Sequence, residues 1–145
     1  MAYLGKDFAF ESQENIEEFI EALGFPEEIG TFLLNFKPNT RLEKEGDTYT
    51  LFTQNPDSEN PLEVSFENGT EKETTLGETK IKSTYKVEGD SVIQTQTFND
   101  EKSITVTNEF SDDELIVVST CLYHNQTLSQ RDRYSKYSEN AVRLY

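Results

Sequence analysis

Two arginines near the C-terminus are the side chains whose chemistry is easiest to specify in this chain of 145 residues. Residues 129–137 read SQRDRYSKY and alternate with the period of a β-strand, so Arg131, Arg133, Ser135 and Tyr137 share one face. A guanidinium group in a semi-enclosed site is a natural partner for a carboxylate, which it binds through two parallel hydrogen bonds. If this face lined the inside of a closed sheet, it would bind an anionic group.

The opposite arrangement is also open. The two arginines would then lie outside and pair with surface acids, and the inner face would consist of Leu128, Gln130, Asp132, Tyr134 and Lys136. Composition alone favours this alternative, because 28 acidic residues stand against 13 basic ones and give a net charge of −15. The choice depends on which face of the last strand looks inward.

Other side chains give weaker indications of chemistry. His124 is the only histidine and Cys121 the only cysteine, so neither a cluster of metal ligands nor an internal disulfide is predicted. We expect Cys121 to be a buried, unreactive thiol, because no basic residue lies beside it in sequence. Acidic pairs occur on every segment and look like a solvated surface rather than catalytic carboxylates. The sequence therefore predicts neither an enzyme nor a cofactor.

The elements that must position these residues begin with one strand and one helix. Residues 5–11 alternate, with Phe8 and Phe10 on one face, which predicts a strand. Asn15 followed three residues later by Glu18 is typical of a capping box. The next apolar residues follow helical spacing up to Gly24, which predicts a short helix.

A second short helix should follow at once. Pro26 suits its first position, and Lys37-Pro38 should end it. Its apolar residues are Ile29, Leu33, Leu34 and Phe36. Two helices this short are unstable alone, so the pair must dock on another element.

From residue 39 onward, turn signals recur every 8–12 residues, as in an antiparallel meander or barrel. They lie at residues 45–47, 55–57, 68–69, 76–77, 88–90, 99–100, 111–113 and 124–125. With the first strand this makes ten strands. We predict a mainly β fold: a ten-stranded, antiparallel, up-and-down β-barrel of the β-clam, lipocalin-like type, with an N-terminal helix-turn-helix lid over one end.

Charge and hydropathy restrict the partners and the location. A net charge of −15 argues against nucleic acid and against stable association with an anionic membrane. No apolar run approaches the roughly 18 residues of a membrane span, and no secretory signal is visible at the start. We expect a cytoplasmic monomer.

Several short motifs, in order and spacing, resemble the intracellular lipid-binding family, the fatty-acid-binding proteins, and look most like its insect members. These motifs are YLGK at 3–6, QEN at 13–15, LG at 23–24, KP at 37–38, EGD at 45–47, VSF at 64–66, IKS at 81–83 and VTNEF at 106–110. The similarity extends from about Tyr3 to about Tyr137. Residues 1–137 are therefore expected to form a single lipid-binding domain, and residues 138–145 a flexible C-terminal extension.

The resemblance implies a carboxylate site, but this chain departs from it. The family usually has an arginine on the eighth strand, where this chain has Asn108, and Arg-x-Tyr on the last strand. Here Arg133 is followed two residues later by Ser135, and a register shifted by two residues would use Arg131 and Arg133 instead. The sequence Arg143-Leu144-Tyr145 matches literally but would need a long unstructured loop. The resemblance nevertheless favours the arginine face as the inner one.

The function implied by the resemblance is a non-catalytic intracellular carrier. It would bind a long-chain fatty acid or similar hydrophobic ligand inside the barrel, with the carboxylate held by Arg131, Arg133, Asn108, Ser135 and Tyr137. Loss of charge at Asn108 leaves open a neutral lipid or a retinoid. Entry is expected at a portal formed by Leu33, Leu34, Phe36, Asp57 and Leu76. The strong acid excess also fits an alternative, a barrel that protects other molecules against stress, like the heat-soluble secreted proteins of tardigrades.

Overall fold

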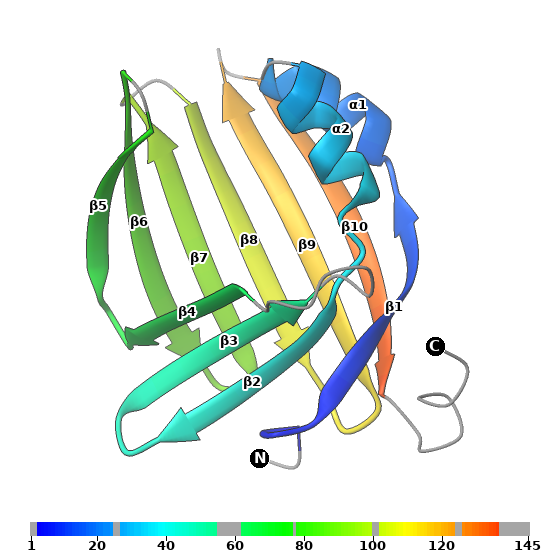
Figure 1. The fold of residues 1–145 in the computed structure, drawn as a ribbon, viewed down its shortest axis with the longest axis vertical. Helices are drawn as coiled ribbons and strands as arrows, with labels where there is room; N and C mark the ends of the chain where they lie inside the picture. The colour runs from blue at the N-terminus through cyan, green and yellow to red at the C-terminus, as the bar shows by residue number, and fades with distance from the viewer. Residues whose placement is uncertain are drawn as a thin grey trace.

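A single curved sheet with two helices at one end is the architecture of the protein (Figure 1). This computed structural model describes residues 3–24, 27–54, 62–76, 78–99, 102–123 and 126–136. The helices are α1 (Ile16–Leu23) and α2 (Glu27–Asn35). The strands are β1 (Asp7–Glu14), β2 (Asn39–Glu45), β3 (Thr48–Gln54), β4 (Leu62–Glu67), β5 (Glu71–Leu76), β6 (Thr79–Glu88), β7 (Ser91–Phe98), β8 (Lys102–Phe110), β9 (Glu114–Tyr123) and β10 (Gln126–Lys136).

All strand pairs are antiparallel, and the sheet order is β4-β3-β2-β1-β10-β9-β8-β7-β6-β5. Strands that follow each other in the chain are therefore sheet neighbours except for β4 and β5, and β1 pairs with β10, which confirms the predicted ten-stranded, up-and-down topology. The register of β1 against β10 shifts between Phe10 and Ser12. Such a bulge bends the strand, and in Figure 1 the β2–β4 segment crosses in front of the longer strands.

The strands at the two ends of the sheet, β4 and β5, do not pair with each other. The turn between them is fixed to β6, because the Gly69 amide donates to the Tyr85 carbonyl over 2.8 Å and the Tyr85 amide donates to the Thr70 carbonyl over 2.9 Å. Beyond this turn, the Lys72 ammonium on β5 donates to the Ser65 carbonyl on β4. The gap is thus bridged by side chains rather than by a backbone ladder.

Aromatic rings fill the inner side of the sheet at the end away from the helices. The Phe66 ring of β4 stacks on Tyr85 of β6 at 4.8 Å and on Tyr49 of β3 at 5.7 Å. Tyr3 stacks on Phe110 at 5.0 Å. These rings belong to a buried cluster that also holds Phe8, Leu42 and Leu115. Burial of this apolar surface is the main contribution to the stability of the fold.

The other end of the sheet is covered by α1, which packs against β9 and β10. Phe19 is buried there with Ile104 and Cys121, so the predicted burial of the cysteine is confirmed. Gly24 ends the helix in a left-handed conformation, as predicted.

The predicted capping box at the start of α1 is wrong. Asn15 adopts a left-handed backbone conformation (φ 62°), and its side chain makes no cap hydrogen bond. Its Nδ2 instead donates to the Ser129 carbonyl of β10 over 2.8 Å. The side chain thus ties the start of the lid to the last strand, and a tertiary contact replaces the local one.

Some predicted features lie outside the described residues. These are Pro26, the turns at 55–57 and 124–125 with His124, Gly77, and residues 137–145 with Arg143 and the expected extension. Within the described ranges, neither helix has the length and apolar character that a membrane crossing requires.

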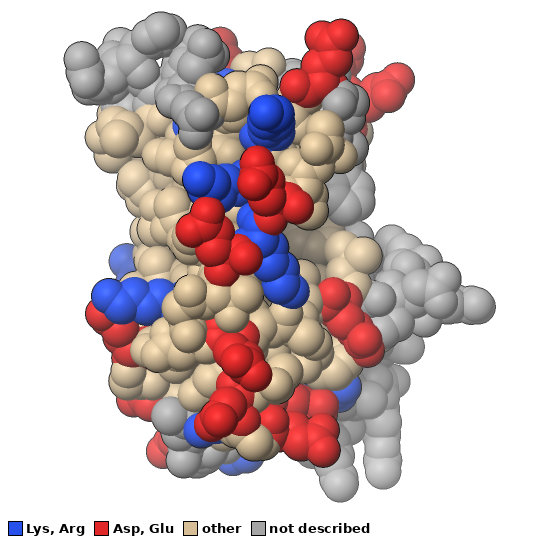
Figure 2. Space-filling model, turned by 90° about the vertical axis from the view of Figure 1, so that its left-hand side faces the viewer, with Lys and Arg blue, Asp and Glu red and all other residues tan. Residues whose placement is uncertain are grey.

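Several basic side chains on the surface pair with acidic ones. Figure 2 shows acidic and basic groups interleaved on one side of the molecule. On β5 and β6, Lys82 pairs with Glu71 at 3.4 Å and Lys86 pairs with Glu88 at 2.6 Å. These exposed pairs contribute little stability, roughly 0–1 kcal/mol each.

Candidate ligand cavity

A cavity of about 270 Å³ lies inside the curved sheet, under α1. This volume is near the lower end of the roughly 300–1,000 Å³ of ligand pockets in proteins. Apolar side chains from the lid and from three strands form much of the wall; they include Ile16, Phe19, Ile20, Leu51, Val106 and Val117. The described interior is therefore hollow at the lid end, and the other end holds the buried aromatic cluster.

Polar side chains of β10 form one side of the cavity wall. Gln130, Asp132 and Tyr134 alternate along the strand and all line the cavity. The Gln130 Nε2 donates a hydrogen bond to an Asp132 carboxylate oxygen. The Tyr134 hydroxyl lies within hydrogen-bonding reach of Thr40 and close enough to Asp132 for the two groups to interact electrostatically.

Burial changes the acidity of both titratable groups on this wall. Loss of solvation raises the pKa of Asp132 from 3.8 to about 6, against the opposing effect of the Gln130 hydrogen bond. Burial also raises the pKa of the Tyr134 hydroxyl above its ordinary value, and the Asp132 charge adds to this. At neutral pH the wall therefore carries one carboxylate and a neutral phenol.

Gln13 of β1 completes this polar group. It is the direct cross-strand partner of Asp132, and it also lines the cavity. Its Oε1 is buried and has no hydrogen-bond partner within the described part of the chain. Asn108 of β8 is buried on another side of the wall and donates from Nδ2 to the Val92 carbonyl over 3.2 Å.

The prediction that the arginine face of the last strand looks inward is wrong. Arg131 and Arg133 are both exposed, and they lie in a shallow outer depression with Ser12 and Glu14. The Arg133 guanidinium is 3.6 Å from the Glu114 carboxylate, and the two side chains are 53% and 41% exposed. Because successive residues of a strand point to opposite faces, placing Tyr134 inside necessarily places both arginines outside.

The other three residues predicted to hold a carboxylate, Asn108, Ser135 and Tyr137, do not lie together either. Ser135 shares the outer face and donates from its hydroxyl to Glu11. Tyr137 lies outside the described residues. Only Asn108 reaches the cavity. The structure therefore does not bring the predicted set together, and binding of a ligand by Asn108 stays a prediction.

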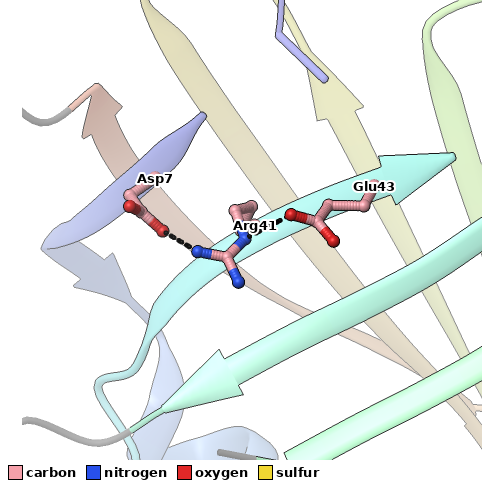
Figure 3. A network of polar contacts seen from close by, with 3 residues as sticks. All are labelled: Asp7, Arg41 and Glu43. Atoms are coloured by element: carbon pink, nitrogen blue, oxygen red, sulfur yellow. Dashed lines mark hydrogen bonds and ion pairs between the residues drawn. The ribbon is translucent and has the colours of Figure 1, made fainter. Parts of the chain in front are cut away.

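Arg41 is the other arginine in the described ranges, and it too lies on the outer face. Its guanidinium lies between Asp7 of β1 at 3.4 Å and Glu43 of β2 at 3.1 Å (Figure 3). It also lies over the Phe52 ring, 4.7 Å from its centroid. No arginine in the described part of the chain is available to a ligand inside the sheet.

Comparison with known proteins matches this architecture. Residues 1–131 match the model of the lipocalin / cytosolic fatty-acid binding protein family. The chain belongs to this family. Fatty acid-binding protein 1 of Manduca sexta is 38% identical over 122 residues, which cover 83% of this chain and 89% of that protein.

Solved structures of the family have the same fold. A fatty acid-binding protein from brain tissue of Drosophila melanogaster superposes with a TM-score of 0.75 at 28% identity, covering 92% of this chain and 98% of its own. A secretory abundant heat-soluble protein of Ramazzottius varieornatus superposes with a TM-score of 0.73 at 26% identity, covering 94% and 96% of the two chains. The fold therefore does not by itself distinguish a fatty acid-binding protein from a heat-soluble protein.

The predicted portal is described only in part. Phe36, just after α2, lines the cavity, and Leu34 on α2 is 37% exposed. Leu33 lies in α2 and Leu76 ends β5, but their side chains are outside the described set, as is Asp57. The portal stays a prediction.

Sequence reasoning did not place Gln13 at a cavity, and it gave Gln130, Asp132 and Tyr134 only as the alternative inner face. A signal for the last three was present, because their face of the strand also carries Leu128, whereas the arginine face up to Ser135 carries only serine and arginine. An apolar residue and an aromatic ring on one face are stronger indications of the interior than two arginines.

Proposed function

We propose that this protein is a non-catalytic carrier that encloses one hydrophobic ligand in the cavity under α1. The observation that supports it is a hollow interior with a largely apolar wall, into which polar side chains of several strands also project, among them the group formed by Gln13, Gln130 and Asp132. Relatives named for fatty acid binding support the same class of function.

Apolar burial should supply most of the affinity. Each buried methylene contributes about 0.8 kcal/mol, whereas one hydrogen bond to a charged group contributes roughly 1.5–3 kcal/mol. The hydrocarbon part of the ligand therefore determines how tightly it binds, and the polar group of the wall determines which end lies against β10. The carboxylate clamp by Arg131 and Arg133 forms no part of this proposal.

A matched pair of variants on β9 tests whether the ligand binds in this cavity. Ser119 lines the cavity, and the preceding residue, Val118, points outward and is the cross-strand partner of Arg131. Ser119→Phe should fill the cavity, and Val118→Phe should leave it open. We expect an uncharged fluorescent hydrophobic probe to bind the unmodified protein and Val118→Phe with one-to-one stoichiometry, and Ser119→Phe at least tenfold more weakly. Equal binding by the two variants would contradict the proposal.

The same titration separates the protective alternative, which the likeness to a heat-soluble protein and the net charge of −15 favour. A carrier binds the probe with one-to-one stoichiometry. A protein that acts only through its acidic surface does not bind it. Native mass spectrometry of the purified protein would identify a hydrophobic ligand that remains bound.

A further inference from the structure

The charge of the cavity wall is negative, which matters for the polar end of any ligand enclosed there. Among the described lining residues, Asp132 is the only one charged at neutral pH; the polar remainder are amides, hydroxyls and the Tyr134 phenol. Lys37 lies over the Phe10 ring, 5.7 Å from its centroid, and does not belong to the wall. A carboxylate ligand would thus be placed beside another carboxylate.

The same part of the wall also has unused hydrogen-bond acceptors. An ionised carboxylate accepts about four hydrogen bonds, and within the described part of the chain Asp132 accepts one, from Gln130. The Gln13 Oε1, on the residue directly opposite Asp132, is buried without a partner. Buried acceptors without partners are costly and therefore rare in folded proteins, so a donor brought by a ligand would be favourable at this place.

These two observations point to one ligand chemistry, and the inference rests on the proposed carrier function. We propose that the ligand is a long-chain hydrophobe whose polar end is a hydrogen-bond donor, an amine or a hydroxyl, held by the Asp132 carboxylate and the Gln13 amide oxygen. A ligand with a carboxylate end binds more weakly, because two like charges would be enclosed together.

The ionisation of Asp132 gives amines and carboxylates opposite pH dependences. With a pKa of about 6, the side chain becomes charged as the pH rises from 5 to 7. From β1, β2, β8 and β9 the facing groups are Gln13, Thr40, Asn108 and Val117, none of which titrates in this range. Tyr134 stays neutral because burial raises its pKa. Binding of an amine should therefore strengthen over this interval, and binding of a carboxylate should weaken.

The test uses three probes with the same hydrocarbon chain, namely dodecylamine, dodecanol and dodecanoate. Each displaces the uncharged fluorescent probe at pH 5 and at pH 7.5. The matched variants are Asp132→Asn and Glu109→Gln, which remove one negative charge each, the first inside the cavity and the second on the exposed outer face of β8. At pH 7.5 we expect the best donor to bind at least tenfold more tightly than dodecanoate, as for one charge-assisted hydrogen bond gained.

The variants identify the donor. If it is an amine, Asp132→Asn weakens dodecylamine about tenfold or more and Glu109→Gln leaves it unchanged. If it is a hydroxyl, dodecanol binds as tightly as dodecylamine, and Asp132→Asn weakens both alike. The ranking in the unmodified protein holds even if a variant fails to fold.

Two results would overturn the inference while leaving the carrier function intact. One is dodecanoate binding most tightly at pH 7.5, and the other is identical ligand preferences in Asp132→Asn and Glu109→Gln. Failure of all three probes, together with failure of the fluorescent probe, would overturn the carrier function itself.

Discussion

The buried carboxylate of Asp132 should lower the stability of the folded protein at neutral pH. Its pKa is 3.8 when exposed and about 6 in the fold, because burial disfavours the charged form. Between these values the folded protein retains a proton that the unfolded chain has lost. Stability therefore falls as the pH rises from 4 to 6 and remains lower above 6.

The structure sets the size of the effect. A shift of about two pKa units corresponds to roughly 3 kcal/mol as an upper bound. The side chain is only partly buried, so water screens part of this, and we expect about 1–2 kcal/mol. Asp132→Asn removes the titration and keeps an oxygen that can accept from Gln130. The variant should therefore have a free energy of unfolding about 1–2 kcal/mol higher than the unmodified protein at pH 7.5, and nearly equal at pH 4.

Urea unfolding at pH 4, 5, 6 and 7.5 measures this difference, and Glu109→Gln is the control because it changes the net charge equally from an exposed position. The general effect of pH on a highly acidic protein is common to both variants and cancels in the comparison. A lower stability of Asp132→Asn at pH 7.5, or a difference that does not change with pH, would refute the reasoning.

Three further predictions follow from the placement of individual side chains. Replacing both Arg131 and Arg133 by glutamine should change probe affinity less than twofold and stability by about 0.5 kcal/mol or less, because their guanidinium groups lie in solvent. A tenfold loss of probe affinity in an equilibrium titration would show that these arginines contribute to the binding site. Phe66→Ala should cost about 3–5 kcal/mol in urea unfolding, because a buried ring between two others is removed; a cost below about 1 kcal/mol would show that the stack is dispensable. Cys121 should react with a thiol reagent at pH 7.5 much more slowly in the folded protein than in urea, because it is buried and this burial raises its pKa; equal rates would contradict its burial.

The strands could be predicted from sequence because their signals are local. Turn residues such as those at 45–47, 68–69 and 88–90 interrupt alternating segments, and each of these positions contains a glycine with positive φ in the structure. Sheet order followed from the short connections, which leave few other topologies. The two helices of the lid could also be predicted from local signals, namely their apolar spacing and the stops at Gly24 and Lys37-Pro38.

The inner face of β10 could not be read from its alternation. Period two is the same from either side, and here each face carries both polar and charged residues. The face is decided by partners far away in sequence, such as Phe10 and Leu115, which lie opposite Tyr134. The resemblance implied that the arginines lie inside, whereas this chain has Asp132 on the inner face. The conformation of Asn15 was missed for a similar reason, since its hydrogen-bond partner is Ser129.

Because the facing edges of β4 and β5 are unpaired, the turn that joins these two strands can act as a hinge. The turn at 68–70 is fixed to β6, so the two strands can swing apart from that point without breaking a backbone hydrogen bond between them. The Phe66 ring and the Lys72 contact are what such a movement must separate. Amide hydrogens on the open sides of these two strands should exchange with solvent faster than those of β8 and β9, each paired on both sides. We therefore expect this side of the sheet to open more readily than the strand pairs around it.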